Sequence, residues 1–155
     1  MIKAMIILFL CLVSGTFFFL NYEKTSLNGR HCSGIMVLKA HVPKGSINYF
    51  AEVKMLFTSQ NEGFYALSGT LTLDDKYYEL RRNKYFTYSR IDNYGLYEME
   101  ITRETRSEED TVPDDIAKMV FLPMGTTYMP SFRVLDDRAL LISFLYSPFF
   151  VCTAD

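Results

Sequence analysis

The sequence has no tryptophan, only two histidines and three cysteines, and no excess of positive charge. Its formal net charge of -2 gives no support to nucleic-acid binding, because proteins that neutralise phosphates need an excess of Lys and Arg. No serine lies in a Gly-x-Ser-x-Gly motif, and His31 and Cys32 have no second Cys or His cluster at metal-site spacing. We therefore expect neither an enzyme nor a cofactor, and we predict a protein that binds a partner or a ligand.

The chain has a single long uncharged run, at residues 4–20, and no second hydrophobic span. Its length is close to that of the shortest helix that crosses a bilayer, so we predict an uncleaved transmembrane anchor at residues 1–20. A cleaved signal peptide is the alternative, because Lys3 precedes the run and residues 13–15 resemble a weak cleavage site. The run continues beyond that point, which favours the anchor. A lipoprotein at Cys11 is less favoured, because a bulky residue precedes this cysteine.

The few charges that flank this run only weakly favour an orientation with the amino end in the cytoplasm. With almost no residues ahead of it, an anchor of this kind exports everything that follows. Residues 21–30 are polar and lack periodicity, so we predict a linker there. Residues 31–155 then form one exported domain, which is a normal length for a single packed core.

Two of the three cysteines lie at opposite ends of the exported part. Cys32 opens the domain and Cys152 lies close to its end, so we predict a disulfide between the first and last strands, formed in an oxidising compartment. Closing a loop of this length stabilises a fold by about 4 to 5 kcal/mol on the chain-entropy argument. Two free buried thiols are the alternative.

Apolar and polar residues alternate through much of the exported part, which is the pattern of half-buried strands. From Ile47 to Phe57 every odd-numbered residue is apolar, while most even-numbered ones are polar. Similar segments occur at residues 65–73, 76–90 and 97–102, with turn residues at 61–63, 74–75 and 92–93. The sequence therefore predicts four successive antiparallel strands.

The remainder of the chain is expected to complete this sheet. Residues 103–115 are acidic and predict a solvated loop, which leads to a short helix or turn near 113–120. Strands at 128–134 and 139–146 follow. The fold class is therefore mainly β, an antiparallel up-and-down meander of six to eight strands that closes into a barrel or a strongly twisted sheet. An open sheet packed on one helix is the alternative, and in either case an unpaired edge would accept a partner strand.

Aromatic side chains recur on the inward face of the predicted sheet. Their rings can line a cavity and their hydroxyls can orient an amphipathic ligand. The alternative is that they simply fill the barrel, as side chains do in most small barrels. The candidate ligand-binding residues are Tyr49, Tyr65, Tyr78, Tyr88, Tyr97 and Phe144.

Basic residues alternate with aromatic ones between residues 76 and 90. In an exported, slightly acidic chain we interpret this segment as a face for an acidic partner or an anionic amphiphile, and not for single-stranded nucleic acid. Arg82 and Lys84 fall on the otherwise apolar face, which predicts a bend, a bulge or a strand end that reaches solvent. The candidate partner-binding residues are Arg81, Arg82, Lys84 and Tyr85.

Several short motifs, together with the amino-terminal anchor, resemble the FidL-like membrane protein family of enteric bacteria. These motifs cover most of the exported region. They are Cys32-x-Gly34, Gly69-Thr-Leu-Thr-Leu, Tyr78-x-Leu80-x-Arg82, Tyr85-Phe-Thr-Tyr88, Gly95-Leu-Tyr97 and Ser147-Pro148-x-x-x-Cys152.

The resemblance implies an accessory protein of the inner membrane, with its domain in the periplasm, that stabilises or tunes a ToxR-like transmembrane transcription regulator. It is similar in role to the second members of the ToxR/ToxS and VtrA/VtrC pairs. The resemblance also implies a heterodimer through the periplasmic domains and, as in VtrA/VtrC, a lipocalin-like barrel that receives a bile salt or similar amphiphile. The alternative is a stand-alone periplasmic barrel that binds a small hydrophobic ligand or inhibits an envelope enzyme.

Overall fold

The computed structural model describes residue 9 and residues 11–16, 27–43, 45–58, 61–144 and 147–154. Residues 9 and 11–16 are helical, whereas the other residues of the predicted anchor and most of the predicted linker lie outside the described residues. Among the residues described, no helix is long and apolar enough to cross a membrane.

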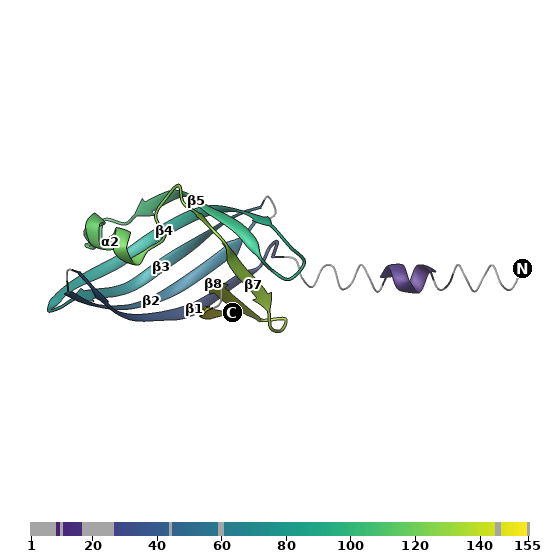
Figure 1. Cartoon of the computed structure of the whole chain (residues 1–155), viewed down its shortest axis with the longest axis horizontal. Coiled ribbons are helices and arrows are strands. Elements are labelled where there is room, and N and C mark those ends of the chain that lie inside the picture. The colour runs from purple at the N-terminus through teal and green to yellow at the C-terminus, as the bar shows by residue number, and fades with distance from the viewer. Residues whose placement is uncertain are drawn as a thin grey trace, which may run out of the picture.

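From residue 27 onward, the described residues form a mainly β domain, as predicted, with nine antiparallel strands where six to eight were expected, and one short helix. The strands form one sheet in the order β6-β5-β4-β3-β2-β1-β9-β8-β7, which curls around a common interior (Figure 1). Its elements are β1 (His31–Val42), β2 (Gly45–Phe57), β3 (Glu62–Leu73), β4 (Lys76–Arg90), β5 (Tyr97–Arg106), α2 (Asp114–Val120), β6 (Thr127–Tyr128), β7 (Pro130–Val134), β8 (Ala139–Phe144) and β9 (Ser147–Thr153).

The alternating pattern places one face of each long strand inside the barrel. In β2 every odd-numbered residue from Ile47 to Phe57 is buried, so the predicted period of two is confirmed. The predicted turn at residues 74–75 is also confirmed, because Asp74 adopts a φ of 49° and its carboxylate accepts a hydrogen bond from the backbone N–H of Ser46.

The sheet almost closes on itself. Leu96, just before β5, forms an isolated bridge with Ser131 of β7, and the Phe132 N–H donates to the Gly95 carbonyl at 2.8 Å. The predicted barrel or strongly twisted sheet is therefore a nearly closed, barrel-like sheet. Inside it, the Phe57 ring packs against three aromatic rings at centroid distances of 5.3 to 5.8 Å. These rings belong to Phe86, Tyr88 and Phe132.

Several predicted boundaries were wrong at the carboxyl-terminal side. The predicted loop at 103–115 begins too early, because β5 continues to Arg106. The predicted strand at 128–134 is two strands, β6 and β7, which pair with different neighbours. An additional strand, β9, was not predicted, because its adjacent residues Phe149, Phe150 and Val151 are all apolar and do not alternate.

The predicted Cys32–Cys152 disulfide is present and joins β1 to β9, with a Cα–Cα distance of 5.3 Å. Backbone pairing between these two strands is limited to Ser33 and Thr153. The disulfide is therefore the main connection across the junction between β1 and β9.

Removing this disulfide should destabilise the barrel strongly. The bond closes a loop with a sequence separation of 120, so Cys32→Ala with Cys152→Ala should lower the free energy of unfolding by about 4 to 5 kcal/mol. Urea unfolding followed by pulse proteolysis measures this change. Cys11→Ser is the matched control, because Cys11 is free and exposed. An unchanged urea midpoint in the double variant would contradict the role assigned to the bond.

Candidate functional site

The barrel has an open edge along β1. This strand pairs with β2 from His31 to Val42, but on its other side it pairs with β9 only at Ser33. Along residues 35–42, the described strands therefore form no backbone ladder on this second side of β1. In Figure 1, β8 and the carboxyl terminus accordingly lie near only one end of β1.

Side-chain burial shows the same opening. On the inner face of β2 burial alternates strictly, but on the inner face of β1 it is lost after Cys32. Leu38 points inward by its register with Tyr49 and is nevertheless 38% exposed. On the outer face Ile35 and Val37 are 62% and 61% exposed. Apolar side chains at an unpaired strand edge are the feature of a surface that pairs with another strand.

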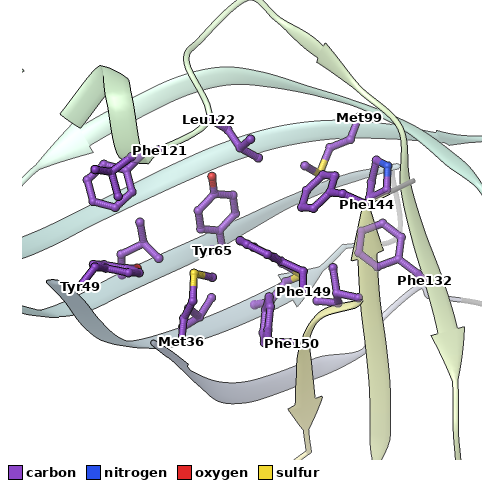
Figure 2. Close-up of a pocket in the computed structure, with 16 residues that line it drawn as sticks. Met36, Tyr49, Tyr65, Met99, Phe121, Leu122, Phe132, Phe144, Phe149 and Phe150 are labelled. Atoms are coloured by element: carbon purple, nitrogen blue, oxygen red, sulfur yellow. The ribbon is translucent and has the colours of Figure 1, made fainter. Parts of the chain in front are cut away.

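An apolar cavity of about 190 Å³ lies inside the barrel next to this opening. Figure 2 shows its lining side chains, which come from β1, β2 and β3, from β5, from the end of α2 and the segment after it, and from β7 to β9. The residues labelled there are Met36, Tyr49, Tyr65, Met99, Phe121, Leu122, Phe132, Phe144, Phe149 and Phe150. Such a lining suits an apolar ligand, but the volume is below the 300–1,000 Å³ typical of drug-sized ligands.

Among the described residues that line this cavity, Tyr49 and Tyr65 carry the only hydroxyl groups, and no charged side chain takes part. The buried Tyr49 hydroxyl has no hydrogen-bond partner among the described residues. Burial raises the pKa of both Tyr49 and Tyr65 well above the usual tyrosine value, and for Tyr65 the charge of Glu104 adds to the effect. Both hydroxyls therefore stay protonated at neutral pH and can donate a hydrogen bond.

The structure separates the six predicted ligand-binding residues. Tyr49, Tyr65 and Phe144 line the cavity. Tyr88 and Tyr97 belong to the aromatic core at the Phe57 end, whereas Tyr78 is partly buried against the core without lining the cavity. The sequence did not indicate Phe121 or Leu122, because they lie in an irregular segment without alternation, although both residues are apolar.

A cluster of buried charges lies on the other side of Phe121. The Arg82 guanidinium donates to both carboxylate oxygens of Asp110 at 2.8 and 3.0 Å, and also to Glu104 and to the Val112 carbonyl. The Lys84 ammonium contacts Glu104 at 2.6 Å and the Leu122 carbonyl at 2.7 Å. These charges are therefore paired, which is the condition under which charged groups are tolerated inside a protein.

The paired charges shift each other's titration. Burial alone would raise the pKa of Glu104, but the hydrogen bonds and positive charges of Lys84 and Arg82 outweigh burial and hold this pKa below the usual glutamate value. Burial alone would likewise lower the pKa of Arg82, but Asp110 and Glu104 raise it. Glu104 and Arg82 are therefore both ionised at neutral pH.

The four predicted partner-binding residues do not form one surface. Adjacent residues of β4 point to opposite faces, so Arg82 and Lys84 are buried while Arg81 is exposed and Tyr85 is half-buried. The expectation of a strand end that reaches solvent at Arg82 and Lys84 was wrong, because β4 continues through both. A bulge is present on the neighbouring strand β5, where Thr102 is inserted between the residues that pair with Tyr85 and Phe86 of β4.

Sequence reasoning missed the partner that makes this burial tolerable. Asp110 lies in the stretch predicted as a solvated loop, yet its side chain is completely buried. The signal available was the pair of charges on an otherwise apolar strand face, since buried cations require a nearby carboxylate. Among the described residues, no group of three or more His, Cys, Asp or Glu side chains could hold a metal ion.

A second, polar cleft of about 480 Å³ lies beside α2. Arg82, Lys84 and Glu104 line it, and Phe121 lines both this cleft and the apolar cavity. The Phe121 ring therefore separates an apolar compartment from a charged one.

The family model described as "FidL-like putative membrane protein" matches residues 69–152, from the second half of β3 to β9. No curated protein matches the chain significantly. The matched region contains the buried charge cluster and the cavity wall formed by Phe121 and Leu122, but it excludes β1 and β2.

Acid should weaken the fold through Glu104. A carboxylate whose pKa is lowered by folding contributes stability above the glutamate pKa of the unfolded chain, about 4.3, and this contribution is lost as the pH falls further. Urea midpoints measured from about pH 7 to about pH 3 should therefore fall less steeply for Glu104→Gln than for the unmodified chain. The control is Glu109→Gln, because the Glu109–Arg81 ion pair is exposed and contributes little. Parallel pH curves for all three proteins would contradict this assignment.

Proposed function

The chain belongs to the FidL-like family, and on this basis we propose that it is a membrane-anchored accessory protein of a ToxR-like transcription regulator. In this proposal the anchor crosses the inner membrane once and the barrel lies in the periplasm. The barrel pairs with the periplasmic domain of the regulator, whose DNA-binding domain is in the cytoplasm. Pairing stabilises the regulator or tunes its activity.

The observation that carries this proposal is the unpaired edge of β1 at residues 35–42. An extended segment of the regulator can add to this edge as a further strand, with main-chain hydrogen bonds that provide affinity. The exposed Ile35 and Val37 side chains lie on the outer face beside Phe50 of β2, which is also exposed. A partner that covers these three side chains would bury apolar surface on forming the complex.

The disulfide supports the periplasmic location. Disulfides persist in oxidising compartments such as the bacterial periplasm and are rare in the cytosol. The bond also lies directly beside the proposed pairing edge, since Cys32 precedes residues 35–42 on the same strand.

Pairing at β1 also gives the proposed regulation a route to a ligand. Met36 on the inner face of β1 and Phe149 and Phe150 of β9 line the cavity, so a strand added between them alters the cavity wall. A bile-salt-like amphiphile is larger than the 190 Å³ available in the unpaired barrel. Its binding therefore requires the gap between β1 and β9 to widen, which an added strand would accomplish.

Charged substitutions on the β1 edge should abolish pairing without unfolding the barrel. The full chain is co-expressed with the full-length ToxR-like regulator of the same organism, purified in mild detergent and analysed by size-exclusion chromatography. The unmodified chain should co-elute with the regulator. Ile35→Lys with Val37→Lys should shift at least tenfold more of the chain to the free peak, because lysines cannot be buried at the new interface.

The control for this experiment is Tyr77→Lys. Tyr77 is 59% exposed on β4, which β3 and β2 separate from β1 in the sheet. The Tyr77→Lys variant should therefore leave co-elution unchanged. Separate elution of the unmodified chain and the regulator at micromolar concentration would count against the pairing itself. Equal co-elution of all variants would count against the β1 edge as the surface.

A further inference from the structure

We propose that the apolar cavity is a binding site for a small neutral ligand that carries one hydrogen-bond acceptor for the Tyr49 hydroxyl. An apolar cavity of about 150 Å³ is sufficient for benzene, so about 190 Å³ corresponds to a ligand of roughly eight to ten non-hydrogen atoms. This ligand is distinct from a bile-salt-like amphiphile, and its binding does not depend on the regulator.

The unpaired Tyr49 hydroxyl points to a ligand. Tyr49 is only 2% exposed, and its hydroxyl has no partner among the described residues. Buried hydroxyls are usually hydrogen-bonded, because an unpaired one loses its contacts with water without compensation. Tyr88 shows the ordinary situation in this same barrel, since its hydroxyl donates to Asn28 at 3.0 Å and contacts the Thr58 carbonyl at 3.3 Å.

The shape of the cavity also fits a ligand better than a packing defect. Side chains usually fill small barrels, but here the lining residues leave space beside the unpaired part of β1. Figure 2 shows aromatic rings and aliphatic side chains around the cavity, with Phe149 and Phe150 on the β9 side and Met36 on the β1 side. A small apolar molecule can therefore enter between these two strands.

The charges around the cavity favour a neutral ligand. Arg82 and Lys84 lie 5.9 Å from the centroid of the Phe121 ring that lines the cavity, and both are already bonded to Glu104 and to other acceptors. The Tyr49 ring packs edge-to-face on the same Phe121 ring at 5.6 Å. An anionic head group beside the Tyr49 hydroxyl would therefore be buried without a cation to pair with it, which costs free energy. A neutral carbonyl or ether oxygen avoids this cost.

Removing the unpaired hydroxyl should stabilise the ligand-free protein. Tyr49→Phe should raise the folded-to-unfolded ratio of the full chain by roughly fivefold or more, because it removes an unsatisfied buried group at constant shape. Tyr88→Phe should lower the same ratio, since it removes a satisfied hydroxyl. Pulse proteolysis in urea on the full chain in lipid nanodiscs measures both ratios. A destabilised Tyr49→Phe would show that the hydroxyl already has a partner and would overturn the proposal.

Ligand binding is tested with two probes of nearly equal shape. 4-Fluoroacetophenone carries a carbonyl acceptor, and 4-fluorocumene replaces this group with an apolar one. Each is titrated by fluorine NMR into the full chain in lipid nanodiscs, with empty nanodiscs as the blank for partition into lipid. Both probes should bind saturably, and Tyr49→Phe should weaken 4-fluoroacetophenone by about tenfold while leaving 4-fluorocumene unchanged. Tyr88→Phe should change neither affinity.

Three results would overturn the site. The first is that neither probe binds saturably beyond the blank. The second is that Tyr49→Phe lowers the affinity for both probes equally, and the third is that this variant binds 4-fluoroacetophenone as tightly as the unmodified chain. Because the regulator is absent, these results are independent of whether the chain pairs with it.

Discussion

The rest of this structure depends on the junction between β1 and β9, where the first and last strands in the chain are neighbours in the sheet but share a single backbone pair. The Cys32–Cys152 disulfide holds these strands together at one end of the junction. Beyond it β1 separates from β9, so the same strand provides a free backbone edge on the outside and an incomplete wall on the inside. Both candidate binding surfaces, the free edge of β1 and the cavity, are therefore consequences of the incomplete pairing between β1 and β9.

The interior is divided by Phe121 into two compartments with different physical roles. On one side, Arg82, Lys84, Glu104 and Asp110 compensate one another's charge, which makes their burial tolerable. On the other side, the cavity has few polar groups, and the Tyr49 hydroxyl is left without a partner among the described residues. The buried charged groups therefore all have partners, whereas one hydroxyl of the apolar cavity has none among the described residues.

Sequence patterns predicted the elements wherever one face of a strand is buried and the other is in solvent. This held for β2 to β5 and for the turn at Asp74, since alternation reports this geometry directly. It failed for β9 and for the break between β6 and β7, where apolar residues are adjacent or the strands are very short. Of the candidate site, Tyr49, Tyr65 and Phe144 were predicted, whereas the cavity wall at Phe121 was not.

The sequence by itself determined the β class and the faces of the long strands and predicted the disulfide, because these follow from local periodicity and from the positions of Cys32 and Cys152. Only the tertiary structure decided that Arg82 and Lys84 are buried, since their burial requires Asp110 and Glu104, which lie twenty or more residues away in the chain. It also decided that Tyr49 faces a cavity while Tyr88 is packed. A hydroxyl finds a partner or lacks one according to which distant segments reach it, and no local pattern records that.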